Sequence, residues 1–168
     1  MQRKKKKSSF PKQTENKKIR NAKKLEINGL KFRSKLEAFT YQKLIESGIT
    51  DFKYESDKFV LQEAFEYRNE SYEAYEKKED KQYVKKFTDV DHKIRSLTYL
   101  PDFTRINYTT KTGWILEVKG YNNDAFPIKW KLFKKYLQDN DYNITLYKPN
   151  TQGNVIKCIE LIKQKYYS

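Results

Sequence analysis

The stretch between Tyr99 and Gly120 constrains the fold more than any other part of the chain. It begins Tyr-Leu-Pro-Asp-Phe and ends Gly-Trp-Ile-Leu-Glu-Val-Lys-Gly, so that charged residues sit at fixed places beside two apolar runs. Residues i and i+2 of a β-strand project from the same face. Glu117 and Lys119 therefore leave one side of a strand, and Asp102 can join them from a neighbouring strand.

A helix is predicted upstream of this stretch, and it contributes a third carboxylate. Ser34 is a good N-cap and Glu37 follows three residues later, which is the capping-box arrangement. The helix is expected to stop at Gly48, a favourable residue just after a helix end. Glu37 also lies in line with the apolar stripe formed by the residues at i+4, i+7 and i+8. Two interpretations remain open, a capping carboxylate and an inward-facing functional one.

Carboxylates that converge on one spot repel each other, by about 4 kcal/mol per pair at about 4 Å and an effective dielectric near 20. They stay ionised together beside a cation, and oxygen ligands suit Mg²⁺ or Mn²⁺. We expect Asp102 and Glu117 to hold such an ion, with the main-chain carbonyl of Val118 as a further ligand. Lys119 would orient a water molecule or neutralise charge on a phosphate. The alternative is an ordinary ion pair between Glu117 and Lys119 on a solvated strand face.

The remaining pattern predicts an α/β domain with a mixed central sheet and helices on both faces. Its elements follow the order helix, three strands, helix, strand, helix. A short hairpin with Asn28-Gly29 at its bend precedes them. The predicted strands cover residues 52–61, 94–106 with a break near Pro101, 114–119 and 143–147; the later helices begin at Pro127 and cover 155–166.

Charge divides the chain into a basic arm, residues 1–25, and one domain, residues 26–168. The arm holds eleven Lys and Arg residues and one Glu, which is most of the net charge of +14. We expect it to be disordered and to seek phosphate groups. Within the domain, residues 62–92 form an insertion with nine acidic and six basic residues. We expect this acidic insertion to be partly helical and to lie either away from the substrate or at a partner chain, where a second protein could dock.

Composition excludes several kinds of site. The single cysteine, Cys158, rules out an intramolecular disulfide and favours a reducing compartment. With His92 as the only histidine, the chain lacks the ligands of a structural zinc site and the pair needed for Cys–His catalysis. We expect no membrane span and no signal peptide, because no apolar run is long enough. The expected location is the cytoplasm.

The ordered motifs resemble the PD-(D/E)XK nuclease signature. They are Phe32-Arg33-Ser34-x-Leu36-Glu37, Tyr99-x-Pro101-Asp102-Phe103 and Glu117-x-Lys119-Gly120. Over roughly residues 30–148 this set is similar to the phage endonuclease I family of Holliday-junction resolvases. The resemblance implies a restriction-endonuclease-like αβββαβ core, here with an extra C-terminal helix and the acidic insertion.

The resemblance also implies what the site residues do. Glu37, Asp102 and Glu117 would bind Mg²⁺, with Mn²⁺ able to substitute, and Lys119 would be the catalytic lysine. A homodimer is implied, because resolving branched DNA at a four-way junction needs two paired cuts. A phage-encoded protein would act in the host cytoplasm or be associated with the virion.

Six basic residues are candidate DNA contacts, and they flank the expected site in the sequence. They are Arg33, Lys35, Lys129, Lys131, Lys134 and Lys135. The last three share one helix face and could follow a phosphate track; a solvated helix face is the alternative. The leading hypothesis is a metal-dependent DNA endonuclease. The alternative is a non-catalytic DNA-binding or virion structural protein, of the head-completion type, that retains the nuclease fold. A third interpretation, binding to RNA or an anionic surface, depends on the basic arm alone.

Overall fold

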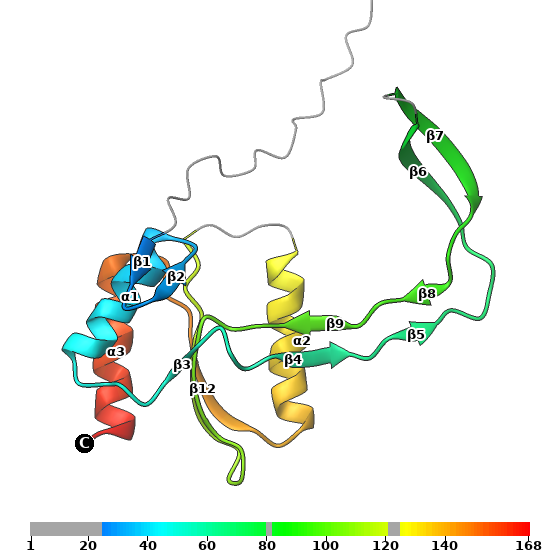
Figure 1. Ribbon diagram of the computed structural model, residues 1–168. Coiled ribbons are helices and arrows are strands. Elements are labelled where there is room, and N and C mark those ends of the chain that lie inside the picture. The colour runs from blue at the N-terminus through cyan, green and yellow to red at the C-terminus, as the bar shows by residue number, and fades with distance from the viewer. Residues whose placement is uncertain (1–24, 80–81, 121–124) are drawn as a thin grey trace, which may run out of the picture.

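The computed structural model describes residues 25–79, 82–120 and 125–168, and its centre is a four-stranded mixed sheet (Figure 1). Apart from Leu25, the predicted basic arm lies outside the described residues. None of the described helices is long and apolar enough to cross a membrane. The elements are, in chain order, β1 (Leu25–Ile27), β2 (Leu30–Phe32), α1 (Lys35–Glu46), β3 (Lys53–Tyr54), β4 (Phe59–Gln62), β5 (Phe65–Glu66), β6 (Tyr72–Glu79), β7 (Gln82–Asp89), β8 (Lys93–Ile94), β9 (Leu97–Tyr99), β10 (Phe103–Asn107), β11 (Thr112–Leu116), α2 (Phe126–Asp139), β12 (Asn143–Tyr147) and α3 (Gln152–Tyr166).

The central sheet has the strand order β12-β11-β10-β3. β10 is antiparallel to both β3 and β11, whereas β11 and β12 are parallel. Gly113, in β11, has φ +146°, and a side chain there would collide with the backbone carbonyl of Arg105 on β10. Tyr166 at the end of α3 donates a hydrogen bond to the Gly113 carbonyl over 2.7 Å. A glycine is therefore required at position 113, where β10 and β11 approach closely. This close approach helps to fix the register of the two strands.

Two hydrophobic cores cover the two faces of the sheet. Trp114 and Leu116 of β11 pack into the core that holds α1 and α3, whereas Ile115 packs under α2. In Figure 1, α1 and α3 lie together on one side of the sheet and α2 on the other. The alternation predicted along residues 114–119 is thus confirmed, and so is an α/β fold with a mixed sheet and helices on both faces.

Local sequence signals place most of the element boundaries correctly. Asn28 and Gly29 form the bend between β1 and β2 with φ values of 51° and 78°. The Ser34 side chain accepts a hydrogen bond from the Glu37 amide at the start of α1, as a capping box requires. Gly48 follows the end of α1 with φ 78°, and Pro127 lies in the first turn of α2.

The predicted strand over residues 52–61 is divided in two. Glu55 adopts φ 43° directly after β3, so the chain turns away from the central sheet before β4 begins. β4 then pairs with β9 in a separate two-stranded sheet. The predicted strand 94–106 is likewise interrupted around Pro101, between β9 and β10.

The insertion at residues 62–92 contains strands and no described helix, so the prediction of partly helical structure was wrong. β5 pairs with β8, and β6 pairs with β7 over eight residues each. Tyr, Val, Phe and Thr residues favour extended backbone, and the segment lacks an apolar face with helical spacing. We refer to residues 63–94 as the β-arm; it projects away from the rest of the molecule in Figure 1.

Candidate active site

Three adjacent strands bring carboxylates to one edge of the central sheet. Phe103 of β10 pairs with Tyr54 on one side and with Leu116 on the other. Continuing both antiparallel registers by one residue places Asp102 between Glu55 and Glu117. The Glu55 amide donates to the Asp102 carbonyl over 2.9 Å, which confirms that the pairing continues on that side.

The fourth strand adds a lysine to the same edge. Leu116 pairs with Tyr147 in the parallel ladder, so the next step brings Lys148 beside Glu117. The Glu117 amide donates to the Tyr147 carbonyl over 2.9 Å, and the Lys119 amide donates to the Pro149 carbonyl over 3.0 Å. β11 itself ends at Leu116, earlier than the predicted strand end at Lys119, but these two hydrogen bonds continue the pairing with the β12 side as far as Lys119.

Glu117 and Lys119 share one face and form an ion pair. The Lys119 ammonium lies 3.2 Å from Oε1 of Glu117. The other carboxylate oxygen of Glu117, Oε2, is buried, and no described donor lies in full hydrogen-bond geometry to it. Hydrogen bonding by the Tyr99 hydroxyl and the Asp102 amide still opposes the rise that burial causes in the pKa of Glu117, which is only 2% exposed. The arrangement thus differs from an ordinary ion pair on a solvated strand.

Asp102 is the central member of the acidic group. Its Oδ2 accepts a hydrogen bond from the Val118 amide over 2.7 Å, which ties it to the strand that carries Glu117. One carboxylate oxygen each from Asp102, Glu37 and Glu55 lie within 4.8 Å of one another. The structure therefore brings Glu37 and Asp102 together as expected, and it adds Glu55, which sequence reasoning did not identify.

Glu37 serves as a helix cap and also faces inward. Its Oε1 accepts from the Ser34 hydroxyl over 2.8 Å. Its Oε2 accepts from the Arg33 amide over 3.0 Å and from the Tyr54 hydroxyl over 2.8 Å. The residue is buried beside Asp102. The two interpretations of Glu37 are therefore compatible, because its hydrogen bonds hold the carboxylate in place at the acidic group.

Burial and mutual repulsion disturb the acidity of these groups. Burial, followed by the charges of Glu117 and Glu37, raises the pKa of Asp102 to about 8. Burial also raises the pKa of Glu117, although Lys119 opposes this effect. Burial and the Glu117 carboxylate raise the pKa of the Tyr99 hydroxyl. The site therefore favours carboxylates that are either protonated or compensated by an added positive charge.

This donor set fits a hard divalent cation. All its side-chain ligands are carboxylate oxygens, which suit Mg²⁺ or Mn²⁺ rather than a soft metal. Glu37, Glu55 and Asp102 could hold the ion directly. Glu117 stands next to Asp102 in the strand register and is also buried. The Val118 amide is occupied by Asp102, and the ligand role expected for the Val118 carbonyl remains a prediction.

A pocket of about 290 Å³ opens over this edge of the sheet. Two of the acidic residues line it together with basic and aromatic ones; the lining is Arg33, Thr98, Tyr99, Leu100, Asp102, Glu117, Lys119, Ala125, Phe126 and Lys129. The Phe126 ring lies 4.6 Å from the Lys119 ammonium and 5.6 Å from that of Lys148. Positive charge is therefore available on the rim of an acidic pocket, which suits an anionic ligand that bridges to a cation.

The six predicted DNA contacts separate into two groups. Arg33 and Lys129 line the pocket, and Arg33 also pairs with Glu55 at 2.9 Å. The other four are exposed and do not line it: Lys35, Lys131, Lys134 and Lys135. The Lys135 ammonium pairs instead with Asp139 at 2.8 Å on the outer face of α2. That contact is what a solvated helix face would show.

Sequence reasoning missed Glu55 and Lys148 because neither lies in a recognisable motif. Glu55 follows a two-residue strand, and its turn into positive φ gives no sequence signal. Lys148 is one of many lysines in the chain, and only the parallel pairing of β11 with β12 brings it beside Glu117. The missing information was strand register in both cases.

Comparison of the sequence and the structure with known proteins assigns the chain to a family but does not assign a function. No curated protein and no solved structure matches the chain. The model of one protein family, described as "Protein of unknown function (DUF1064)", matches residues 17–151. Because that match covers most of the sequence, the chain belongs to the DUF1064 family.

Proposed function

We propose that this protein is a Mg²⁺-dependent DNA endonuclease with a PD-(D/E)XK-type active site. The observation that carries the proposal is the grouping of acidic side chains at one edge of the sheet. One oxygen each from Glu37, Glu55 and Asp102 lie within 4.8 Å of one another, and Glu117, two residues before Lys119, adjoins Asp102 in the strand register. Burial and the neighbouring carboxylates raise the pKa of Asp102. A buried group of acids with a lysine beside it has a clear chemical use where a metal ion and a phosphodiester meet.

The order of the elements supports the same proposal. With β4–β9 set aside, α1, β3, β10, β11, α2 and β12 follow one another as a restriction-endonuclease-like αβββαβ core would. The acidic residues Glu55, Asp102 and Glu117 each adjoin an end of one of the three strands. The motifs around Glu37, Asp102 and Glu117-x-Lys119 meet at one edge of the sheet. α3 is then the extra C-terminal helix, and the β-arm is the insertion.

Mg²⁺ held by Glu37, Glu55, Asp102 and Glu117 would supply a Lewis acid for the scissile phosphate and lower the pKa of an attacking water. The side chains of the protein would hold the ion and the substrate in position and neutralise negative charge on the phosphate. Glu37 is fixed by three hydrogen bonds, and Asp102 is fixed by the Val118 amide. Such fixed groups need little rearrangement when substrate binds.

Lys119 has two roles in this mechanism. Its ammonium pairs with Glu117 at 3.2 Å, so it helps to keep that carboxylate ionised. Its remaining N–H groups can donate to a phosphate oxygen and stabilise the negative charge that develops there. Arg33 and Lys129, which line the same pocket, are placed to bind flanking phosphates.

The substrate proposed is branched DNA, cut by a homodimer, in line with the resemblance to the endonuclease I family. A direct test compares a four-way junction, a flap, a single strand and a linear duplex in Mg²⁺. We expect cleavage of the junction first. Replacing Mg²⁺ by Ca²⁺ should preserve binding and suppress cutting, so binding and chemistry can be measured separately.

Lys119→Ala should reduce cleavage by roughly a thousandfold, a loss typical of removing a group that stabilises transition-state charge. DNA binding in Ca²⁺ should change little. Lys157→Ala, at an exposed position on α3, is the matched control and should cut at the wild-type rate. Cleavage by Lys119→Ala at that same rate would exclude the mechanism. Wild-type protein that binds all four substrates and cuts none would favour the non-catalytic DNA-binding or virion structural protein.

A further inference from the structure

The β-arm exposes aromatic side chains that the rest of the molecule leaves uncovered. Among the described residues, β6 and β7 pair only with each other. Tyr83 and Phe87 on β7 are 72% and 73% exposed, and Tyr72 stands across the hairpin beside Phe87. An isolated two-stranded hairpin is marginally stable in water. Large aromatic side chains in such a position indicate a surface that another molecule covers.

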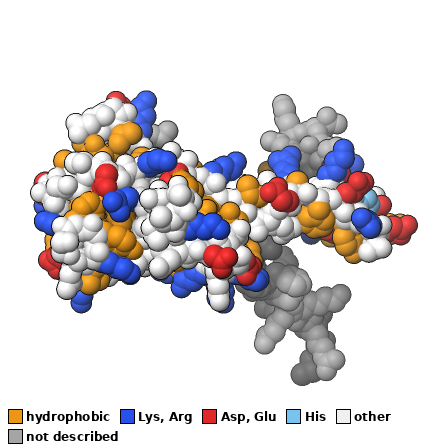
Figure 2. Space-filling model, turned by 90° about the horizontal axis from the view of Figure 1, so that it is seen from below, with side chains coloured by type: hydrophobic (Ala, Val, Ile, Leu, Met, Phe, Trp, Pro, Cys, Tyr) orange, Lys and Arg blue, Asp and Glu red, His pale blue; other side chains and the backbone are white. Residues whose placement is uncertain are grey.

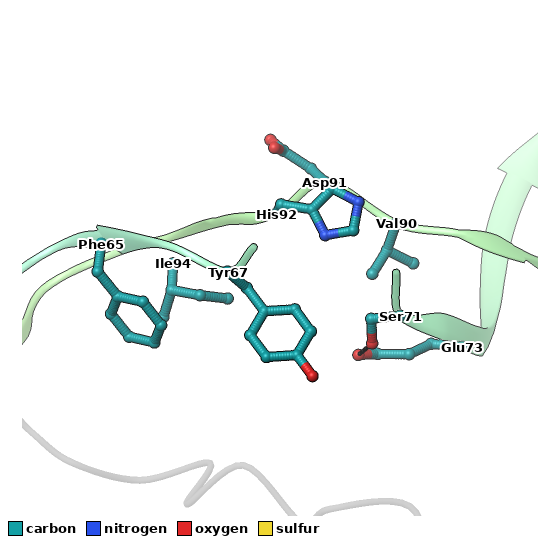
Figure 3. A pocket seen from close by; sticks show the side chains of 8 residues that line it. All are labelled: Phe65, Tyr67, Ser71, Glu73, Val90, Asp91, His92 and Ile94. Carbon is teal, nitrogen blue, oxygen red and sulfur yellow. Dashed lines mark hydrogen bonds between the residues drawn. The ribbon is translucent and has the colours of Figure 1, made fainter. Parts of the chain in front are cut away.

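A pocket of about 250 Å³ lies at the base of the same hairpin (Figure 3). Its walls come from both sides of the β-arm: Phe65, Tyr67, Ser71, Glu73, Val90, Asp91, His92 and Ile94. Phe65, Tyr67 and Ile94 make one end of it apolar. The Nδ1 atom of His92 is buried and lacks a hydrogen-bond partner among the described groups, while Nε2 lies 3.2 Å from Asp89.

This pocket has the chemistry to receive a tyrosine. A phenol ring fits apolar walls, and its hydroxyl can hydrogen-bond to a polar group of the lining such as the Ser71 hydroxyl. Tyr83, near the tip of the hairpin, is an exposed tyrosine of this kind. It cannot reach the pocket of its own chain, because the pocket is at the other end of β6 and β7 (Figure 1). A second copy of the chain can supply it.

Charge is distributed along the β-arm in a way that favours the same partner. The tip, residues 76–86, carries five Lys and three acidic residues, a net charge of +2. The base, residues 63–75 and 87–94, carries six acidic residues against Arg68 and Lys93, a net charge of −4. Two antiparallel β-arms therefore place each positive tip against a negative base. The negative charge at the base of the β-arm would repel DNA, so DNA is not the expected partner of this surface. In Figure 2, blue and red side chains are interspersed with orange ones along this projection.

We propose that two copies of the chain associate through their β-arms, antiparallel and related by a two-fold axis, with Tyr83 of each copy in the base pocket of the other. A two-fold arrangement makes both contacts identical, so one patch is sufficient for a closed dimer. This inference rests on the homodimer of the proposed function and adds the surface that forms it, but it does not depend on nuclease chemistry. Its test asks which surface associates, so a dimer that forms without the β-arm overturns this inference alone, and loss of cleavage by a protein that still dimerises through the β-arm overturns the proposed function alone.

Sedimentation velocity of the full chain should show a dimer at micromolar concentrations. Tyr83→Ser should raise the dissociation constant roughly tenfold or more, as loss of a buried aromatic anchor does. Tyr83→Phe, which keeps the ring and removes the hydroxyl, should have a smaller effect. Leu161→Ser, at an exposed apolar position on α3, is the matched control. A monomer at all concentrations, or a dimer that Tyr83→Ser leaves unchanged, overturns the proposal.

Charge reversal tests the antiparallel geometry. Lys85→Glu with Lys86→Glu changes the tip, and Glu70→Lys with Glu73→Lys changes the base. Each pair alone should weaken the dimer, and all four in one chain should restore it, because every tip then meets a complementary base. Absence of that restoration overturns the antiparallel arrangement.

Cysteine pairing gives an independent measurement of the same geometry. In a Cys158→Ser background, a chain with Tyr83→Cys mixed with a chain with Phe65→Cys should form an intermolecular disulfide under mild oxidation. Tyr83→Cys alone should not cross-link to itself, since the two tips lie at opposite ends. Cross-linking of Tyr83→Cys to itself and not to Phe65→Cys would instead indicate tip-to-tip contact and overturn the proposal.

Discussion

The central sheet and the β-arm use similar aromatic residues in opposite ways. Around the sheet, Phe103, Trp114 and Phe133 are fully buried between the sheet and the helices that cover it. On the β-arm, Tyr83 and Phe87 face solvent although they occupy a regular eight-residue strand. Hydrophobic content alone therefore does not distinguish the two regions. What differs is whether the chain itself supplies a covering layer.

The same contrast applies to charge. The sheet edge buries carboxylates at close range, which is costly without a compensating cation. The β-arm spreads its carboxylates over exposed strands, where solvent screens them. The first arrangement favours binding of a small ion, and the second favours a macromolecular partner of matching charge. Three predictions test this division, from the largest expected change to the smallest.

Aromatic truncation should separate the two regions most strongly. Phe103→Ala should lower the free energy of unfolding by about 3–5 kcal/mol, because it leaves a cavity under the sheet. Phe87→Ala, the matched change on the β-arm, should alter it by less than about 0.5 kcal/mol in monomeric protein. Urea unfolding followed by circular dichroism at low protein concentration measures both. Equal losses would show that the β-arm belongs to the cooperative core.

The acidic edge should make stability depend on pH. The pKa of Asp102 is raised in the folded state, so the stability that it contributes is present at low pH and is lost as pH rises towards and through about 8. In EDTA, wild type should lose roughly 2–4 kcal/mol between about pH 5 and about pH 9 relative to Asp102→Asn. Mg²⁺ should recover much of that loss. Asp139→Asn, which removes an exposed carboxylate on α2, is the control, and its stability should depend on pH as that of wild type does. If Asp102→Asn showed the same pH dependence as wild type, the Asp102 carboxyl would not have a raised pKa in the folded protein.

Substitution of Glu55 tests whether the ion is bound from both neighbours of Asp102, Glu55 on one side and Glu117 on the other. Glu55→Gln keeps the size of the side chain and its proximity to Arg33 but removes one charge. We expect the Mg²⁺ concentration needed for half of the thermal stabilisation to rise roughly tenfold, about 1.4 kcal/mol. Glu46→Gln, an exposed glutamate near the end of α1, should change nothing. An unchanged Mg²⁺ midpoint for Glu55→Gln would place the ion with Glu37, Asp102 and Glu117 alone.

Much of the central fold could be predicted because its signals are local. Ser34 with Glu37, Gly48, Pro127 and the alternation around Glu117 each constrain a few neighbouring residues. The mixed sheet and the two layers of helices follow from their order. The same local reasoning correctly placed Glu117 and Lys119 on one face.

The remainder depended on contacts between distant segments. The sequence around Glu55 does not indicate that its amide donates a hydrogen bond to the Asp102 carbonyl. The sequence around Lys148 likewise does not indicate that β12 pairs in parallel with β11. The β-arm was misjudged for another reason. Its charged, tyrosine-rich sequence has weak periodicity, and strand pairing between β6 and β7 decided its conformation.

The close approach at Gly113 has a consequence for how the site can vary. A slip of one residue between β10 and β11 would turn Glu117 to the opposite face of the sheet and remove it from Asp102. The steric contact between Gly113 and the Arg105 backbone resists such a slip. Asp102 and Glu117 are therefore aligned by the main chain, at a point remote from the chemistry. Substitutions in loops or at surface lysines can therefore leave the geometry between these two acids unchanged, whereas a side chain at position 113 cannot.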